Sequence, residues 1–245
     1  MNGRRVATAG GAILADVALV EAIGEPRAME GLFEPSSQPG QRATPVGGGR
    51  GSAWFIDRGS EQWVLRHFRR GGFMARFSED WYWWAGEERV RAFAEYRVLS
   101  KLATAGLPVP TPLAARYRRR GAWYRCDLIT RRIPGAVALS ARLAAGALPP
   151  ESWRQVGATI ARLHRAGADH ADLNAHNILI DDQGRVTVVD FDRGRIRRGG
   201  AWSTRNLRRL RRSLDKISSA LPAEARAFSD ECWRILLAGY AAASG

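Results

Sequence analysis

The sequence feature that most constrains the fold is a polar loop followed by a hairpin pattern. Residues 170–177 read His-Ala-Asp-Leu-Asn-Ala-His-Asn, and residues 177–180 form a short strand-like run, Asn-Ile-Leu-Ile. The turn sequence Asp-Asp-Gln-Gly at residues 181–184 separates this run from a second one at residues 186–189. Two such runs on either side of a turn predict a β-hairpin. The oxygen-bearing residues beside the two runs are therefore expected to face one cleft.

Three of these residues carry the oxygen atoms that phosphoryl transfer needs. Asp172 and Asn177 have the D-x-x-x-x-N spacing of a protein-kinase catalytic loop, and Asp190 follows the second strand. We predict that Asp172 orients the attacking hydroxyl or accepts its proton, and that Asn177 and Asp190 bind Mg²⁺. His170 is expected to support the loop. The alternative is an ordinary hairpin with polar loops and a structural histidine.

A glycine-rich segment precedes the first predicted strand of the N-terminal half. Gly49 and Gly51 stand just before the strand-like residues 53–56. Their backbone amides are expected to cover nucleotide phosphates, as in the glycine-rich loop of a kinase. Taken alone, the segment also fits a surface turn.

The next predicted strand, residues 62–68, carries a departure from the protein-kinase pattern. Arg66 occupies the place of the lysine that contacts the α- and β-phosphates. Arginine stays charged and offers two donors to a phosphate, so we predict a nucleotide-binding role for it. Glu95, on the helix expected over residues 87–103, is the predicted ion-pair partner, with Glu88 as the alternative.

The order of predicted elements indicates an α+β fold with two lobes, like that of a protein kinase. Residues 1–45 are expected to be an N-terminal extension with partial order. Residues 46–132 are expected to form a small β-rich N-lobe, which holds the nucleotide-binding sheet and one helix. Residues 133–245 are expected to form a helical C-lobe with the catalytic loop, the metal site and the acceptor site.

Charge limits the partner to something anionic. The formal net charge is +14, and Lys101 and Lys216 are the only lysines, so arginine carries most of the positive charge. Arginine suits carboxylates and phosphates, but the long-range field does not separate nucleic acid, anionic lipid and phosphorylated substrates. Genome composition is an alternative source of the arginine bias.

Positive charge is concentrated in two segments, residues 66–72 and residues 206–212. In the second segment, helical spacing places Arg208, Arg211 and Arg212 on neighbouring turns. These three residues are candidate clamps for an anionic acceptor, and a solvated basic surface is the alternative.

The remaining sequence features concern the compartment and the membrane. Cys126 and Cys232 are too few for a disulfide framework and lack metal-ligand spacing, which fits a reducing cytosol. No export signal is evident, and no apolar run approaches the roughly 18 residues of a transmembrane helix. Any membrane contact should therefore be peripheral. The aromatic residues 81–84, Trp-Tyr-Trp-Trp, fit either lipid headgroups or core packing.

Taken together, these motifs resemble the lipopolysaccharide kinase family, and most closely its kinases of 3-deoxy-D-manno-octulosonic acid (Kdo). The resemblance extends from residue 47 to about residue 213, and Arg66 is usual for the family. The segments that carry it are Gly49-Arg50-Gly51 and residues 65–72, 106–110, 170–179, 190–192 and 206–213.

The resemblance implies ATP and Mg²⁺ as cofactors and phosphorylation of the 4-hydroxyl of Kdo on a Kdo-lipid A precursor, in lipopolysaccharide core biosynthesis. It also implies peripheral attachment to the cytoplasmic face of the bacterial inner membrane, with this glycolipid rather than nucleic acid as partner. Asp192 replaces the glycine of Asp-Phe-Gly, and no Ala-Pro-Glu segment follows, so no activation-loop switch is expected.

Two alternatives to this function stay open. One is a sister kinase that acts on heptose or another small hydroxylated acceptor. The other is a non-catalytic pseudokinase or basic nucleic-acid binder, which would bind RNA or DNA in a salt-dependent way without ATP turnover.

Overall fold

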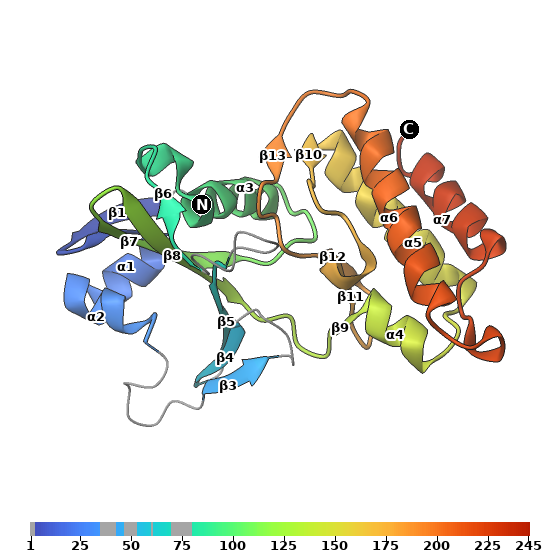
Figure 1. Cartoon of the computed structure of the whole chain (residues 1–245), viewed down its shortest axis with the longest axis horizontal. Helices are drawn as coiled ribbons and strands as arrows, with labels where there is room; N and C mark the ends of the chain where they lie inside the picture. The colour runs from blue at the N-terminus through green and yellow to red at the C-terminus, as the bar shows by residue number, and fades with distance from the viewer. Residues whose placement is uncertain (1–2, 35–42, 47–52, 60, 70–79) are drawn as a thin grey trace. The chain divides into compact units, whose positions relative to one another are not determined.

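The computed structural model describes residues 3–34, 43–46, 53–59, 61–69 and 80–245 (Figure 1). The chain divides into two compact units. The first comprises Met1–Lys101 and Thr111–Arg132, and the second comprises Leu102–Pro110 and Ile133–Gly245. Gly49 and Gly51, the predicted phosphate-covering glycines, lie outside the described residues.

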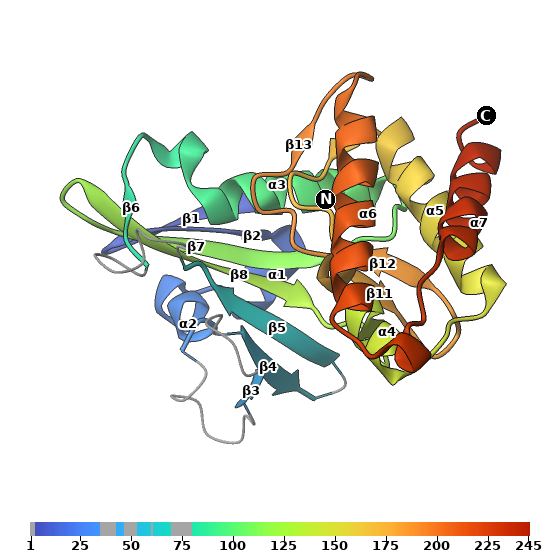
Figure 2. The same ribbon diagram turned by 45° about the vertical axis from the view of Figure 1, so that its right-hand side comes forward.

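The first unit is built on an antiparallel sheet, which has eight strands within the described residues. The strand order is β1-β2-β7-β8-β5-β4-β3, and β6 pairs with β8. These strands are β1 (Gly3–Thr8), β2 (Gly11–Asp16), β3 (Ala43–Val46), β4 (Ala53–Arg58), β5 (Glu61–His67), β6 (Tyr82–Trp83), β7 (Pro112–Arg120) and β8 (Trp123–Arg131). The long β7–β8 hairpin, visible in Figure 2, turns at Gly121, whose φ of 59° suits glycine.

The sequence predicted a separate N-terminal extension of partial order, but residues 3–16 form β1 and β2, two strands of the sheet. Strand β2 pairs with β7, and Ala12, Ile13 and Ala15 in β2 are completely buried. A strand covered on both faces reads as a continuous apolar run instead of an alternating one, which hides it in the sequence.

Two short helices follow these strands, α1 (Val17–Ile23) and α2 (Pro26–Gly31). The Asp16 carboxylate caps α1 by accepting a hydrogen bond from Ala18 N at 3.0 Å. Met29 of α2 packs with sheet residues such as Ile56 and Ile129 in the core of this unit. Burial of side chains of this size stabilises a fold by about 1.5–3 kcal/mol each.

Helix α3 (Arg91–Thr104) starts later than the predicted residue 87, because Glu87–Arg89 form the separate 3₁₀ turn η2. Its buried face includes Phe93, Glu95 and Leu99. Glu95 is a charged residue on this otherwise apolar face, and such a buried charge requires a partner of opposite charge. Its partner is described with the candidate site.

The second unit is mainly helical. Its helices and 3₁₀ turns are α4 (Leu139–Ala145), α5 (Pro150–Arg165), η3 (Ala175–Asn177), α6 (Trp202–Ser219), η4 (Ala223–Ala225) and α7 (Asp230–Ala242). Its short strands are β9 (Val137–Ala138), β10 (Ala168–Asp169), β11 (Ile178–Ile180), β12 (Val186–Val188) and β13 (Arg195–Ile196). Figures 1 and 2 both show α5, α6 and α7 side by side.

Close contact between α5 and α7 depends on glycine. A Cβ atom on Gly157 would lie 2.0 Å from Leu236 O, and one on Gly239 would lie 2.3 Å from Arg154 O. The two backbones therefore touch at positions where no larger residue fits.

The predicted hairpin is confirmed, with β11 and β12 paired from Ile178↔Val188 to Ile180↔Val186. Asp181 Oδ1 accepts hydrogen bonds from Gln183 N and Arg185 N, each at 2.9 Å, which fixes the turn. Among the described residues, no helix has the length and apolar character to span a bilayer.

Candidate active site

His170 ties the start of the predicted catalytic loop, residues 170–177 and called the catalytic loop below, to the end of strand β12. The ring is buried, its Nε2 lies 2.9 Å from Val189 O, and its Nδ1 accepts a hydrogen bond from Asp172 N at 3.2 Å. Because the Val189 carbonyl can only accept a hydrogen bond, Nε2 carries a proton. Nδ1 accepts a hydrogen bond and so carries none, which makes the ring neutral. Burial lowers the pKa of His170, which agrees with this state. These contacts support the predicted scaffolding role.

Asn177 closes the loop from its other end. Its Nδ2 donates to Asp172 O at 3.0 Å, and its backbone oxygen accepts from Val189 N at 2.9 Å. With the amide nitrogen used in this way, Oδ1 is the atom of Asn177 that suits a metal ion. The backbone of Asp172 is thus fixed to Asn177, and Asn177 is fixed beside the residue that precedes Asp190.

Asp190 leaves the strand in an unusual backbone conformation. Its φ is 63°, in the left-handed region, which aspartate tolerates better than most residues but which still costs about 1 kcal/mol. The next residue, Phe191, is buried, with its ring centroid 4.6 Å from that of His170. The turn is therefore held by packing against the histidine that also holds the catalytic loop.

Within the second unit, hydrogen bonds join the backbone of Asp172 to Asn177 and Asn177 to Val189, the residue before Asp190. Among the described residues, no group of three His, Cys, Asp or Glu side chains could hold a metal ion. Mg²⁺ at phosphoryl-transfer sites needs only one or two protein oxygens and takes phosphates and water for the rest. Asn177 and Asp190 fit that requirement, and their metal-binding role stays a prediction.

Helix α6 anchors the catalytic loop through residues that sequence reasoning missed. Buried Asn206 faces both backbone groups of His170. With its amide assigned to match them, it donates to His170 O at 2.9 Å and accepts from His170 N at 3.1 Å. About two helical turns further along, Ser213 Oγ accepts a hydrogen bond from Ala175 N at 3.2 Å. The one sequence signal for this role is the spacing of Asn206, which lies four and eight positions before the buried Leu210 and Leu214 and so shares their helix face.

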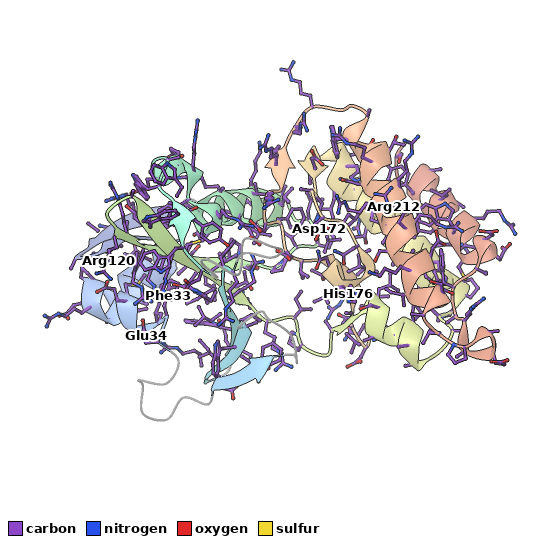
Figure 3. The ribbon with its side chains drawn as sticks, viewed as in Figure 1. Phe33, Glu34, Arg120, Asp172, His176 and Arg212 are labelled. Carbon is purple, nitrogen blue, oxygen red and sulfur yellow. The ribbon has the colours of Figure 1, made fainter. Side chains whose placement is uncertain are left out.

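Arg209, also on α6, contacts the predicted catalytic carboxylate. Its Nη1 lies 2.9 Å from Asp172 Oδ1, and both side chains are about half exposed, at 47% and 57%. An ion pair this exposed contributes at most about 1 kcal/mol to stability. The contact matters because Arg209 also lines a pocket beside the loop. Figure 3 labels Asp172 and Arg212, another residue that lines this pocket.

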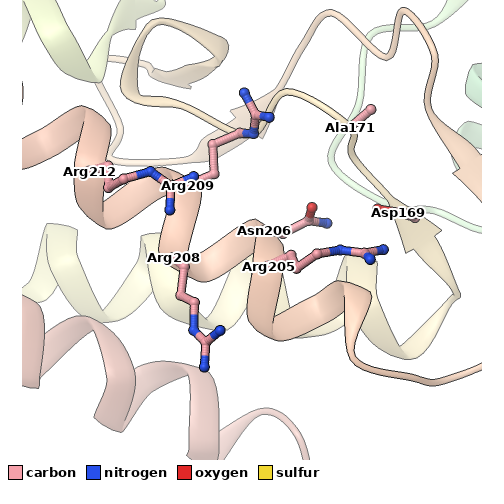
Figure 4. A pocket seen from close by; sticks show the side chains of 7 residues that line it. All are labelled: Asp169, Ala171, Arg205, Asn206, Arg208, Arg209 and Arg212. Atoms are coloured by element: carbon pink, nitrogen blue, oxygen red, sulfur yellow. The ribbon is translucent and has the colours of Figure 1, made fainter.

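That pocket has a volume of about 420 Å³ and is lined by arginines of α6 (Figure 4). Its lining residues are Asp169, Ala171, Arg205, Asn206, Arg208, Arg209 and Arg212. Of the three predicted clamps, Arg208 and Arg212 line it.

The prediction was wrong for Arg211, which does not line the pocket. Its guanidinium lies 2.9 Å from Asp215 and 2.6 Å from Asp230. Hydrogen bonding to Asp230 is the main cause that raises its pKa. Arg211 is therefore bound within the protein and joins α6 to the start of α7.

In the first unit, the predicted partner of Arg66 is the observed one. Arg66 Nη2 forms a salt bridge with Glu95 Oε2, and Glu95 is 2% exposed. The alternative partner, Glu88, pairs with Arg97 at 2.8 Å instead. A buried carboxylate fixes the position of the guanidinium, and the contact of Arg66 with nucleotide phosphates stays a prediction.

The residue after Arg66, His67, belongs to a partly buried charge network that the sequence did not reveal. His67 Nδ1 lies 2.6 Å from Asp127 Oδ1, and His67 Nε2 lies 3.1 Å from Asp80 Oδ2. Burial acts to lower the pKa of His67, but the two carboxylates outweigh it and raise the pKa. Burial likewise opposes ionisation of Asp127, yet His67 and Arg116 lower its pKa. The network joins β5, β7 and β8.

Comparison with known proteins decides the family. The family model described as "Lipopolysaccharide kinase (Kdo/WaaP) family" matches residues 40–240, which is most of the chain. The chain belongs to the lipopolysaccharide kinase (Kdo/WaaP) family. The resemblance seen in the sequence motifs is therefore confirmed, and as a member of this kinase family the protein is a phosphotransferase.

Several relatives of this lipopolysaccharide kinase family member carry the name 3-deoxy-D-manno-octulosonic acid kinase. The chain is 53% identical over 190 residues to that of Stenotrophomonas maltophilia (strain K279a) and 49% identical over 189 residues to that of Xylella fastidiosa (strain M12). It is 50% identical over 191 residues to that of Xanthomonas campestris pv. campestris (strain B100). Each match covers 76% of this chain and 75% of the relative.

Proposed function

We propose that this protein transfers the γ-phosphate of ATP to the 4-hydroxyl of Kdo on a Kdo-lipid A precursor, a step of lipopolysaccharide core biosynthesis. One observation carries the proposal. A chain about half identical to Kdo kinases has Asp172 and Asn177 in one hydrogen-bonded loop, and this loop is bonded to Val189, directly before Asp190. The proposal includes a two-lobed, protein-kinase-like arrangement of the α+β fold.

In the proposed reaction, Asp172 acts on the acceptor hydroxyl. A bond forms from the hydroxyl oxygen to the γ-phosphorus while the bond from that phosphorus to the bridging oxygen of ADP breaks. The hydroxyl proton passes to Asp172. The backbone of Asp172 is fixed by His170 and Asn177 before the acceptor arrives, and Arg209 contacts its carboxylate at 2.9 Å.

Asn177 and Asp190 would hold Mg²⁺, which when bound neutralises charge on the β- and γ-phosphates. In the first unit, Arg66 would contact the α- and β-phosphates, with Glu95 fixing its guanidinium. Gly49 and Gly51 would cover the phosphates with backbone amides.

We also propose that the protein attaches peripherally to the anionic cytoplasmic face of the bacterial inner membrane. Of the aromatic segment 81–84, Tyr82 is buried and Trp84 packs 5.0 Å from Tyr117, which fits core packing. Trp83 differs, because it is 62% exposed and its ring contacts Trp123, which is 43% exposed. These two tryptophans form an aromatic pair that suits a headgroup layer.

Positive charge accompanies the aromatic pair. The β7–β8 hairpin ends in the exposed Arg118, Arg119 and Arg120, directly before the turn that leads to Trp123. Juxtaposed arginine and tryptophan match an anionic lipid surface in charge and in polarity.

Incubation with Mg-ATP and purified Kdo-lipid A precursor tests the proposed reaction. Mass spectrometry should show one added phosphate on the lipid, and NMR should locate it on O4 of Kdo. A panel with a heptose-containing acceptor and a free sugar measures selectivity. Preferential phosphorylation of the heptose-containing acceptor would show that heptose, not Kdo, is the acceptor sugar. RNA binding without any phosphoryl transfer would contradict the proposed reaction.

A further inference from the structure

The arginine face of α6, defined as Arg205, Arg208, Arg209 and Arg212, has no structural explanation within the fold. Their spacing of three, four and seven positions places them on one side of the helix. All four line the pocket of about 420 Å³ beside the catalytic loop, as Figure 4 shows. Like charges on adjacent turns destabilise a helix unless an anion lies among them.

Within the residues that the structure describes, Arg209 is the one member of this face that pairs with a carboxylate, that of Asp172. Within the described part of the chain, no acidic side chain forms a salt bridge with Arg205, Arg208 or Arg212. Asp169 lines the pocket, but it pairs with Arg197 at 3.0 Å. Arg211, on another side of the same helix, pairs with two aspartates. The unpaired charge is therefore confined to the side of α6 that faces the pocket.

The pocket adjoins the predicted catalytic carboxylate within the same unit. Arg209 both lines the pocket and contacts Asp172 Oδ1 at 2.9 Å, and Ala171 of the lining precedes Asp172 in the loop. Asn206 bonds to both backbone groups of His170, so α6 and the loop are held in register. An anion in the pocket would therefore lie at a fixed position relative to Asp172.

We propose that the arginine face of α6 binds an anionic group of the acceptor, a sugar carboxylate or a glycolipid phosphate, and thereby selects acidic glycolipids. The inference rests on the proposed function, in which Asp172 acts on the acceptor hydroxyl. Guanidinium groups form paired, charge-assisted hydrogen bonds with both kinds of anion. A solvated basic surface would need neither a hollow nor a fixed link to Asp172.

Steady-state kinetics of Arg205→Gln, Arg208→Gln and Arg212→Gln test the inference, with Arg209 left intact because it contacts Asp172. We expect the KM for Kdo-lipid A precursor to rise about tenfold for at least two of them, the loss typical of one charge-assisted hydrogen bond. The KM for ATP should not change, and lysine at the same positions should restore part of the affinity. Arg234→Gln, which removes one exposed charge from α7, is the matched control and should behave as wild type.

Modified acceptors separate the two anion sources. If the pocket holds the Kdo carboxylate, its methyl ester should raise the wild-type KM but should add nothing to the KM of the glutamine variants. If the pocket holds a lipid phosphate, a dephosphorylated precursor should raise the wild-type KM and should leave the KM of the glutamine variants unchanged. Modifications that act equally in wild type and variants would overturn the inference, as would variants with an increased KM for ATP and an unchanged acceptor KM.

Direct binding keeps this result separate from the proposed function. Titration of each protein with the acceptor, without ATP, measures the pocket even if no phosphate is transferred. A wild type that binds the acceptor more tightly than the variants but transfers no phosphate would contradict the proposed function alone. Equal acceptor Kd values, with melting temperatures that show all variants folded, would overturn the inference.

Discussion

At the scale of single residues, His67 shows how two carboxylates determine the charge of a partly buried ring. Both ring nitrogens face a carboxylate, Asp127 at 2.6 Å and Asp80 at 3.1 Å, so the protonated ring satisfies both contacts. Its pKa is raised in the folded protein. The stabilisation is therefore complete below the ordinary histidine pKa of about 6.5 and is lost as the pH rises through the folded-state value.

We predict that His67→Gln destabilises the protein more at pH 6 than at pH 9. Glutamine keeps a neutral donor but cannot carry the positive charge, so the difference at low pH should be about 1–3 kcal/mol. Urea unfolding of both proteins at the two pH values measures it. A constant difference across this range would mean that His67 is neutral in the fold. His176→Gln, at an exposed position of the other unit, serves as the control.

Sequence alone was sufficient for the residues whose neighbours are close in the chain. Asp172 and Asn177 belong to one loop, and the hairpin that follows brings Val189 back beside Asn177. The contacts of His67 with Asp127 and of Asn206 with His170 join distant segments, and no local pattern reports them. Arg66 and Glu95 were paired correctly because a known kinase pattern supplied the missing long-range information.

At the scale of elements, α6 is the support of the catalytic loop. Trp202, Asn206, Leu210, Leu214 and Ser218 form its buried stripe, and Asn206 is the member that reaches the loop backbone. The helical spacing predicted for residues 206–212 is confirmed, because this segment lies within α6, Trp202–Ser219.

We predict that Asn206→Leu lowers both stability and kcat. Leucine has a similar volume, but it leaves His170 N–H and C=O buried without partners, which costs about 1–3 kcal/mol. Chemical unfolding and turnover of the acceptor measure the two effects. The neighbouring substitution Leu207→Ala, at a partly exposed position of the same helix, should change both much less. Full turnover by a destabilised Asn206→Leu protein would show that α6 supports the fold but not the active geometry.

At the scale of the whole molecule, the net charge of +14 indicated an anionic partner but not where it binds. The structure sorts the arginines into different environments. Arg116 is 3% exposed and pairs with Asp127, and Arg211 pairs with two aspartates, so neither is available to a ligand. Arg205, Arg208 and Arg212 line the pocket beside Asp172 and form no salt bridge within the described part of the chain. The composition gives only the sum of these charges. The tertiary structure distinguishes arginines that pair with carboxylates inside the protein from arginines that a ligand could reach.

The exposed tryptophans give a prediction at this scale. The double variant Trp83→Ala and Trp123→Ala should lose about tenfold in binding to vesicles that contain anionic lipid, because two interfacial aromatic side chains are removed. Co-sedimentation with such vesicles, and with vesicles of neutral lipid, measures the loss. Phosphorylation of a detergent-solubilised acceptor should persist. Unchanged sedimentation would exclude this aromatic pair as the site of membrane contact.

The central claim is that Asp172, Asn177 and Asp190 form one site for Mg²⁺-dependent phosphoryl transfer. Single-turnover transfer from ATP to Kdo-lipid A precursor, followed by mass spectrometry of the lipid, tests it in wild type, Asp172→Asn and Asp190→Ala. The account predicts a phosphorylated product from wild type only with Mg²⁺, a rate lower by about 10²–10⁴ for Asp172→Asn, and no product from Asp190→Ala. Wild-type rates in either folded variant would contradict it.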